Sequence, residues 1–455
     1  MRKLNIVIMA AGKGTRMKSD LPKVAHLLAG KALVAHVADL VAQVTATPPV
    51  VVVGYRMEVV KAALGTRPAG FAEQLEQLGT GHAVIQAAPR LDASLPTLVL
   101  NGDVPLIRQA TLERLLDTAG TTRLGLLTAV VADASGYGRI LRDAAGRVLA
   151  IIEHKDASAD ELAIKEYYTG TMLIPPGKLK GWLAQLSSAN AQREYYLTDL
   201  VKLAVADGVD VVATHPDETW ETEGINDRVQ LAAQERACQR ETARRLQEAG
   251  VTIIDPARFD VRGTLKCAND VQIDIGCVFS GSVSLGSGVT VGAYSILHNV
   301  SLGAGTEVLP YSHLDGATVG ANGRIGPYAR LRPGSVLADE VHIGNFVEVK
   351  NATIANNSKA NHLAYVGDAT VGARVNIGAG TITCNYDGAN KHRTVIEDDV
   401  FIGSDTQLVA PVTVKRGATL GAGTTLTKDA PEDSLTISRA KQVSLANYKR
   451  AVKKQ

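Results

Sequence analysis

The second half of the chain repeats aliphatic residues at intervals of six, and many of them are followed by glycine. Successive groups of three begin 17, 17 and 18 residues apart. The groups are Leu285, Val291 and Leu297; Leu302, Val308 and Leu314; Val319, Ile325 and Leu331; and Leu337, Ile343 and Val349. Three such steps make one turn of a triangular parallel β-helix, in which each coil buries its aliphatic residues only against neighbouring coils. The repeat therefore predicts this fold, and a β-sandwich with coincidental spacing is the disfavoured alternative.

The repeat resumes at Val371 and again at Ile402, but two stretches are out of step with it by composition: residues 355–370 and 384–394 carry Asn, His, Tyr and Lys in place of aliphatic residues. Because excursions from a rigid scaffold often present binding residues, we expect a site at these two interruptions. Parallel crossovers are right-handed in about 98% of cases, so the periodicity does not indicate the hand of this helix.

The first half of the chain has a different pattern. Between Leu4 and Gly224, short aliphatic runs such as LNIVIM, PPVVVVG and TLVLNG alternate with helix-length segments. Strands that are apolar along their whole length are typical of a mostly parallel sheet covered on both faces, which predicts a Rossmann-like α/β domain. Residues 226–249 contain no Gly or Pro, so we expect a helix there that ends at Gly250. The predicted domains are 1–225, a linker helix at 226–250, and a β-helix with a basic tail at 251–455.

Charge and cysteine content narrow the class of protein. The formal net charge is +2, which favours neither a nucleic-acid partner nor a membrane partner. Four cysteines without a CxxC pair indicate a reducing compartment. The N-terminus lacks the apolar segment of a signal peptide, and no run approaches the ~18 apolar residues that span a bilayer. We expect a cytoplasmic protein.

The run LNIVIM leads directly into AAGKGTRM, which places a glycine-rich turn with Lys13 and Arg16 at the carboxyl edge of the predicted sheet. Backbone N–H groups at such a turn can hold phosphates, and the two cations would neutralise them. The alternative is a tight turn with solvated charges. Asp103 directly follows the run TLVLNG, so it is expected at the same edge.

Further motifs carry a resemblance. They are LPK ending at Lys23, EQLGTGHA at 76–83, NGD at 101–103, GYGRI at 136–140, EHKDA at 153–157 and EGIND at 223–227. Together with the glycine-rich turn they resemble the sugar-phosphate nucleotidylyltransferases. With the β-helix included, essentially the full chain resembles the bacterial bifunctional N-acetylglucosamine-1-phosphate uridylyltransferase/glucosamine-1-phosphate acetyltransferases, whose β-helix is left-handed.

For the first domain the resemblance implies UMP transfer from UTP to N-acetylglucosamine-1-phosphate, giving UDP-GlcNAc for cell-envelope precursors, with Mg²⁺ as cofactor. Asp103 and Asn226 would hold the magnesium ion, and Arg16 and Lys23 would act on the phosphates. The residues implied in nucleotide and sugar binding are Met9, Ala10, Ala11, Gly12, Lys23, Gln74, Gly79, Thr80, Asn101, Gly102, Asp103, Gly138, Glu153, Tyr168, Thr169 and Asn226. Gln74, Gly79 and Thr80 would contact uracil. Tyr168 departs from the family, which has an asparagine that contacts the sugar at this position.

For the second domain the resemblance implies acetylation of glucosamine-1-phosphate by acetyl-CoA. His362 would be the general base, which amine acylation requires, and Glu348 would orient it. The sugar phosphate would be held by Arg332, Lys350, Tyr365, Asn376 and Lys391, and acetyl-CoA by Ala379, Asn385, Tyr386, Ser404, Ala422 and Arg439. The basic tail after Arg439 would lie near the phosphates of CoA, or it is a solvated terminus.

The resemblance also implies a homotrimer with acetyl-transfer sites between subunits. Three other hypotheses stay open: a monofunctional nucleotidylyltransferase whose β-helix is structural, an enzyme for a different sugar or base, and a binding scaffold without catalysis. The segments NHLAY, CNYDG and FIGSD argue against the first of these, because they carry the polar groups that acetyl transfer needs.

Overall fold

The computed structural model describes residues 2–453. The chain forms two compact units, Met1–Cys238 and Gln239–Gln455, and the boundary between them lies within α8 (Arg228–Glu248). None of the described helices combines the length and the apolar character needed to cross a bilayer.

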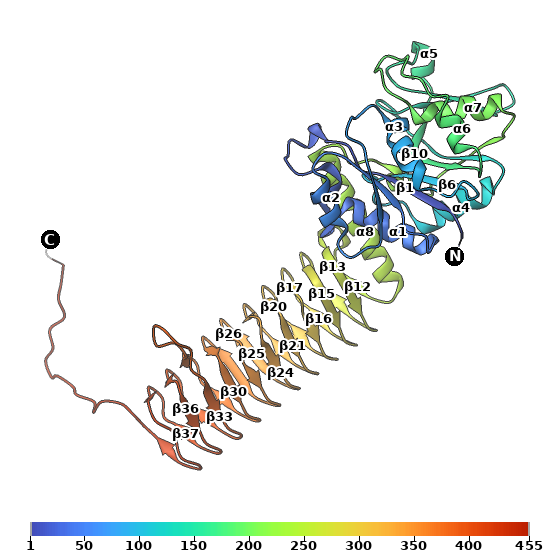
Figure 1. The fold of residues 1–455 in the computed structure, drawn as a ribbon. Coiled ribbons are helices and arrows are strands. Elements are labelled where there is room, and N and C mark those ends of the chain that lie inside the picture. The colour runs from blue at the N-terminus through green and yellow to red at the C-terminus, as the bar shows by residue number, and fades with distance from the viewer. Residues whose placement is uncertain (1, 454–455) are drawn as a thin grey trace. The chain divides into compact units, whose positions relative to one another are not determined.

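The first unit contains a nine-stranded sheet whose main path is β11-β7-β10-β6-β1-β4-β5. Figure 1 labels β1, β6 and β10 of this sheet. Its strands are β1 (Asn5–Met9), β4 (Val50–Val53), β5 (Gly70–Glu73), β6 (Thr97–Asn101), β7 (Leu124–Val130), β8 (Arg139–Arg142), β9 (Val148–Ile152), β10 (Glu166–Ile174) and β11 (Val211–Thr214). The hairpin β2 (Leu27–Leu28) and β3 (Lys31–Ala32) lies outside it. Along the main path only β10 runs antiparallel to its neighbours, so the sheet is mostly parallel, as predicted.

Helices cover both faces of this sheet. They are α1 (Leu33–Val44), α2 (Met57–Leu64), α3 (Thr80–Ala87), α4 (Gln109–Ala119), α5 (Ala159–Leu162), α6 (Leu179–Leu183) and α7 (Leu200–Ala206). Alternate residues of β1 point to opposite faces: Ile6 and Ile8 belong to the core that includes α1 and α4, and Val7 belongs to the core that includes α3, α6 and α7. Because both faces are buried, the strands are aliphatic along their whole length.

The second unit is a stack of parallel coils that forms two sheets. The strands of the first sheet are β12 (Thr252–Ile253), β14 (Gln272–Ile273), β16 (Thr290–Val291), β19 (Glu307–Val308), β22 (Arg324–Ile325), β25 (His342–Asn345), β28 (Lys359–His362), β31 (Asn376–Ile377), β34 (Phe401–Ile402), β37 (Thr419–Leu420) and β39 (Leu435–Thr436). The strands of the second sheet are β13 (Asp260–Cys267), β15 (Val278–Leu285), β17 (Ile296–His298), β18 (Ser301–Leu302), β20 (His313–Asp315), β21 (Ala317–Val319), β23 (Arg330–Leu331), β24 (Ser335–Leu337), β26 (Glu348–Lys350), β27 (Thr353–Ile354), β29 (Tyr365–Gly367), β30 (Ala369–Val371), β32 (Ile382–Cys384), β33 (Thr394–Ile396), β35 (Gln407–Val409), β36 (Val412–Val414) and β38 (Thr425–Leu426).

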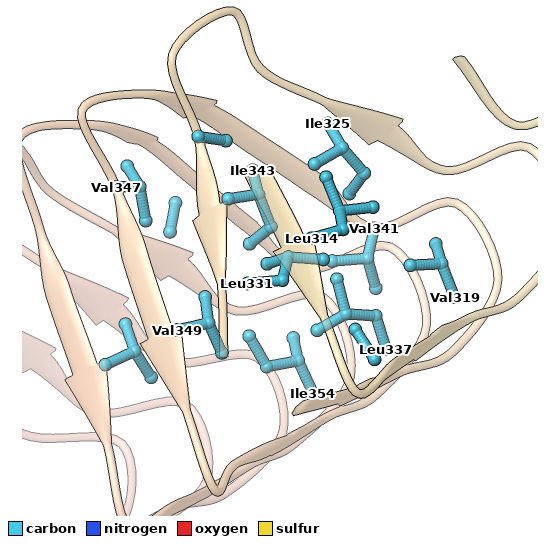
Figure 2. Close-up of a cluster of buried hydrophobic side chains, with 14 of the residues drawn as sticks. Leu314, Val319, Ile325, Leu331, Leu337, Val341, Ile343, Val347, Val349 and Ile354 are labelled. Carbon is cyan, nitrogen blue, oxygen red and sulfur yellow. The ribbon is translucent and has the colours of Figure 1, made fainter. Parts of the chain in front are cut away.

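The repeating aliphatic residues fill the interior of this stack. In register, Ile325 pairs with Ile343 and Leu331 with Val349, so each side chain lies on its counterpart in the next coil. Figure 2 shows these side chains gathered between the strands, together with Val341 and Val347. The predicted fold class, a Rossmann-like α/β domain followed by a parallel β-helix, is confirmed.

The two predicted interruptions of the coils have different outcomes. The first, residues 355–370, is wrong: β28 and β29 continue the coils, and Ala360 and Val366 take the inward positions. Ala360 fits there because it stacks between Ile343 and Ile377, whose larger side chains fill the space. The second, residues 384–394, does leave the coil, and its ends are closed by an antiparallel bridge between Tyr386 and Lys391.

Removal of one interior side chain tests the stacking. We expect Leu331→Ala, at a position with 0% exposure, to lower the free energy of unfolding by about 2–5 kcal/mol, because rigid neighbouring coils cannot collapse into the cavity. Urea titration followed by circular dichroism would measure this. The matched exposed variant Val336→Ala, in the next strand, should cost less than about 0.5 kcal/mol; equal losses for the two variants would contradict the packing described here.

Candidate functional site

A cavity of about 340 Å³ opens at the carboxyl ends of β1 and β6. These parallel strands end side by side, with Met9 opposite Asn101. The predicted residues that line it are Met9, Ala10, Ala11, Gly12, Lys23, Gln74, Gly79, Thr80, Asn101 and Asp103. Segments far apart in the sequence are thus brought together at one edge of the sheet, where parallel α/β sheets bind ligands.

A second cavity of about 230 Å³ shares four of these residues, so the two form one continuous site. The shared residues are Met9, Thr80, Asn101 and Asp103. The further predicted residues in the second cavity are Arg16, Gly138, Glu153, Tyr168, Thr169 and Asn226. Gly102 is not among the lining residues of either cavity. Its backbone N–H donates to the Met9 carbonyl at 2.9 Å, and a Cβ atom at Gly102 would lie 3.0 Å from that oxygen, so its small size serves packing.

The two predicted metal ligands, Asp103 and Asn226, both contact the ammonium group of Lys23. The ammonium group of Lys23 donates to the carboxylate of Asp103 and, at 2.9 Å, to Oδ1 of Asn226. Carboxylate and amide oxygens are ligands that Mg²⁺ accepts, with substrate phosphates and waters completing its shell. Within residues 2–453 no group of three or more His, Cys, Asp or Glu could hold a metal. The oxygens around the Lys23 ammonium therefore fit a cation held by two protein ligands.

A bulge in β10 shapes the second cavity. The pairing of β10 with β7 shifts between Tyr168 and Thr171, and Gly170 lies there with φ of +90°. A Cβ atom at Gly170 would lie 1.9 Å from the side-chain nitrogen of Asn101, so only glycine leaves room for that amide. The hydroxyl of Thr169 donates to the Leu127 carbonyl at 2.8 Å and is therefore engaged with the backbone.

Two titratable side chains lie against the second cavity with unusual environments. Burial raises the pKa of Glu153, whose Oε1 accepts from the Thr198 hydroxyl at 2.9 Å. Tyr168 is 9% exposed, and its hydroxyl is buried without a hydrogen-bond partner among the described residues. Burial, followed by the nearby charge of Glu153, raises the pKa of Tyr168, so the phenol stays neutral. An enclosed donor of this kind has hydrogen-bonding capacity left for a ligand.

Tyr168→Phe should therefore act with opposite signs on stability and on binding of the sugar phosphate that the resemblance implies at this site. Without ligand, we expect the free energy of unfolding to rise by about 1 kcal/mol, because an unpaired buried hydroxyl is lost while the ring is kept. With ligand, the KM for the sugar phosphate should rise about 5-fold, because one hydrogen bond is lost. Thermal unfolding with and without sugar phosphate, beside steady-state kinetics, measures both; a destabilised apo protein with unchanged KM would contradict this role.

Several predicted site residues of the second unit form a row along one corner. Asn345 pairs with His362, and the next strands continue in register through Ile377, Ile402 and Leu420. The residue two places after each of these last three lies in the same row: Ala379, Ser404 and Ala422. The backbone confirms the stacking, since Asp405 N–H donates to Ala379 at 2.7 Å and Gly423 N–H to Ser404 at 2.8 Å. The predicted base and three predicted acetyl-CoA contacts thus follow a line of roughly 14 Å.

Within one chain, His362 contacts a different side chain from the predicted Glu348. Nδ1 of His362 lies 2.9 Å from Oδ1 of Asn345. Glu348, the predicted orienting group, instead accepts from Arg332 at 2.8 Å and lies 3.5 Å from Arg330. Glu348 is in a different sheet from His362. It follows Asn345 by three residues, across a corner of the coil, and there the arginines of the adjacent coil attract its carboxylate. Within one chain Asn345 is therefore the residue that orients His362.

Three cations converge beside Glu348. The ammonium of Lys391 and, next, the charge of Arg332 lower the pKa of Lys350, because like charges disfavour its protonated form. Lys350 is in register one coil after Arg332, and the 384–394 excursion brings Lys391 to them. An anion with several oxygens would relieve this repulsion, so the cluster fits a phosphate group.

The remaining predicted residues of the second site are arranged around the same excursion. The side-chain nitrogen of Asn385 lies 3.4 Å from the Tyr365 hydroxyl and also donates to the buried carboxylate of Asp368. The Tyr386 ring is exposed, and its hydroxyl donates to the Gly388 carbonyl at 2.6 Å. Asn376 lies in β31, in the other sheet, so the structure of one chain does not bring it to the cations.

At the end of the row, the guanidinium of Arg439 donates to the Ala422 carbonyl at 3.1 Å, which joins the start of the basic tail to the row. The tail from Arg439 to Lys453 is exposed.

Several residues of the sites were missed by sequence reasoning. Gln77 and Glu194 line the first cavity and Tyr137 and Thr198 line the second, while Asn345 holds His362. Gln77 and Tyr137 lie inside the motifs EQLGTGHA and GYGRI, so those motifs carried the signal. Asn345 could have been found by counting back 17 residues, one coil, from His362.

Known proteins are similar to this chain over nearly its whole length. The family model described as MobA-like NTP transferase domain matches residues 6–252, and the model described as GMPPB C-terminal domain matches residues 261–362. A relative from Cupriavidus pinatubonensis is 62% identical over 451 residues, which cover 99% of each chain. One from Ralstonia pickettii is 60% identical over 452 residues, 99% of each chain, and one from Bordetella parapertussis is 59% identical over 456 residues, covering 99% of this chain and all of the relative. All three bear the name Bifunctional protein GlmU.

Proposed function

The chain belongs to the GlmU family of bifunctional proteins, and we propose that it acetylates glucosamine-1-phosphate with acetyl-CoA and then transfers UMP from UTP to the product. The final products are UDP-GlcNAc and pyrophosphate, a sugar nucleotide for cell-envelope synthesis. One observation carries the proposal: residues from many separate segments line two joined cavities in the first unit, while His362 and the cation cluster stand in the second.

In the first unit, the nucleotide would lie in the cavity beside the glycine-rich turn and the sugar phosphate in the cavity beside Glu153. A phosphate oxygen of N-acetylglucosamine-1-phosphate attacks the α-phosphorus of UTP. The new P–O bond forms as the bond to the β-phosphate oxygen breaks, and pyrophosphate leaves. Arg16 and Lys23 offset the charge on the phosphates. We propose that Asp103 and Asn226 hold Mg²⁺, which when bound stabilises charge on the transferred phosphate.

In the second unit, the hydrogen bond to Asn345 supports Nε2 of His362 as the base. An amide oxygen only accepts, so Nδ1 carries the proton and Nε2 is left unprotonated. The amine of glucosamine-1-phosphate attacks the thioester carbon of acetyl-CoA. The C–N bond forms and the C–S bond breaks, Nε2 takes the amine proton, and the sulfur leaves as the CoA thiolate, which that proton then neutralises. Arg332, Lys350 and Lys391 would bind the sugar phosphate.

We propose that the protein is a homotrimer whose second copy closes the acetyl-transfer site. His362, Ser404 and Ala422 are not buried in one chain, whereas acyl transfer benefits from a site that excludes water. Beside the row runs a stripe of exposed apolar side chains, each 45–63% exposed: Tyr294, Tyr311, Tyr328, Phe346 and Leu363. Its aromatic rings stack at 5.1–5.5 Å between centroids. Contiguous exposed apolar surface of this kind marks a protein interface, and light scattering would give the mass of the assembly.

The remaining parts of the proposal follow from the same chemistry. UTP and acetyl-CoA would be the co-substrates, and both are cytoplasmic metabolites, so we propose that the protein acts in the cytoplasm. Its partners would be small molecules and further copies of the chain, with no nucleic acid and no membrane.

Product analysis tests the proposed function. Purified protein is given glucosamine-1-phosphate, acetyl-CoA, UTP and Mg²⁺, and mass spectrometry follows the products. We expect N-acetylglucosamine-1-phosphate, free CoA, UDP-GlcNAc and pyrophosphate. UDP-GlcNAc formed only when N-acetylglucosamine-1-phosphate is supplied would instead indicate a monofunctional enzyme with a structural β-helix. If the protein prefers another sugar phosphate or nucleotide, it is an enzyme for a different sugar or base, which is the alternative that Tyr168 leaves open.

A further inference from the structure

A hydrogen-bonded chain of three side chains stands behind the nucleotide cavity. Gln74 follows β5 and is buried, with 4% exposure. Its amide nitrogen donates to the Gly79 carbonyl at 3.1 Å and lies 3.2 Å from Nδ1 of His82. On the other side of the imidazole, Nε2 of His82 lies 3.0 Å from the side-chain amide nitrogen of Gln86. His82 and Gln86 are one turn apart on α3, so one helix holds both.

The chemistry of these contacts orients the amide of Gln74. The Gly79 carbonyl only accepts, so the group facing it must be the amide nitrogen of Gln74. The same nitrogen faces Nδ1 of His82, which must then be the accepting nitrogen of the ring. A neutral imidazole has one donor and one acceptor, so the proton is on Nε2. To accept that proton, the side-chain amide of Gln86 is rotated by a half-turn, so that its oxygen faces Nε2 of His82. This rotation exchanges the oxygen and the nitrogen and leaves the shape of the amide unchanged.

The oxygen of Gln74 is consequently the end of the amide that remains free for the cavity. Both hydrogens of its amide are directed away, one to Gly79 and one to His82. Gln74 lines the first cavity. Some buried side-chain atoms of the described residues lack a hydrogen-bond partner, and Oε1 of Gln74 is not one of them. The cavity therefore presents a hydrogen-bond acceptor, and the Gly79 carbonyl and His82 together hold the Gln74 amide in this orientation.

We propose that His82 is a positioning residue for base selection: through Gln86 and its own tautomer, it holds Gln74 with the carbonyl oxygen toward the base. This inference rests on the proposed uridylyl transfer. The N3 position of uracil is a donor, which the oxygen of Gln74 accepts. The N3 position of cytosine is an acceptor, so in CTP two lone pairs would face each other. A site that hydrogen-bonds one partner in this way rejects the analogue strongly, because its buried group is left unpaired.

The test compares two variants of the full chain, one that keeps a hydrogen-bond acceptor at position 82 and one that removes it. His82→Asn keeps an oxygen where Nδ1 stands, whereas His82→Leu keeps bulk and removes the acceptor. The measured quantity is kcat/KM for UTP divided by kcat/KM for CTP, with N-acetylglucosamine-1-phosphate and Mg²⁺ supplied. We expect this ratio to fall about 10-fold in His82→Leu, mainly through KM, and less than about 3-fold in His82→Asn.

The outcomes separate this inference from the proposed function. If the unaltered chain transfers no UMP, the proposed function fails. If it does, and the ratio in His82→Leu stays within about 2-fold of the unaltered chain, or His82→Asn loses as much selectivity as His82→Leu, the positioning role is overturned. Should His82→Leu fail to fold, Gln86→Leu decides: because Gln86 maintains the tautomer, its loss should lower the ratio about 3-fold, and an unchanged ratio would refute the relay.

Discussion

His362→Ala is expected to lower acetyl transfer to glucosamine-1-phosphate by about 10²–10⁴-fold while UMP transfer to supplied N-acetylglucosamine-1-phosphate stays within about 2-fold. The loss follows because Nε2 of His362 is the free nitrogen of a ring whose Nδ1 is engaged by Asn345. UMP transfer persists because the residues of that site belong to the other compact unit. Thiol release from acetyl-CoA and pyrophosphate release measure the two activities in one preparation.

Asn345→Ala provides the matched control for this prediction. It leaves the imidazole in place but removes the acceptor that fixes its tautomer, so acetyl transfer should fall by about 10-fold, less than in His362→Ala. The assignment of His362 as base would be wrong if His362→Ala retained more than about a tenth of the acetyl transfer. Loss of both activities in His362→Ala would contradict the division of labour between the units.

Asp103→Ala is expected to lower UMP transfer by at least about 100-fold and to leave acetyl transfer unchanged. Asp103 supplies the only carboxylate among the two predicted ligands, and it also pairs with Lys23, so its removal weakens the cation site and leaves the Lys23 ammonium with Asn226 alone among the partners described. Pyrophosphate release at increasing Mg²⁺ concentration measures the effect.

Asp103→Asn keeps an oxygen ligand but removes the charge, and Asn226→Ala removes the other predicted ligand. Both should raise the Mg²⁺ concentration needed for half-maximal rate, with Asp103→Asn retaining more activity than Asp103→Ala. An unchanged Mg²⁺ dependence in all three variants would show that the ion is held elsewhere. Thermal unfolding of the same samples, followed by circular dichroism, checks that the first unit is still folded.

Much of the fold was predictable because its rules are local and repetitive. The six-residue period is visible in the sequence as Ile325, Leu331 and Leu337, and the structure stacks these residues on Ile343, Val349 and Ile354 of the next coil. The composition misled at residues 355–370, because the inward residue at position 360 is an alanine and not a large aliphatic residue, although small side chains also fit between larger neighbours.

The order of elements, the aliphatic strands, the six-residue repeat and the motif residues all follow from the amino-acid sequence, since burial and coil stacking act on residues a few positions apart. The pairing of His362 with Asn345 in place of Glu348, the enclosed hydroxyl of Tyr168 and the Gln74–His82–Gln86 chain required the folded structure. Each depends on the direction of a side chain and on which of several acceptors lies within about 3 Å. Distances on that scale are set by the packing of distant segments against one another.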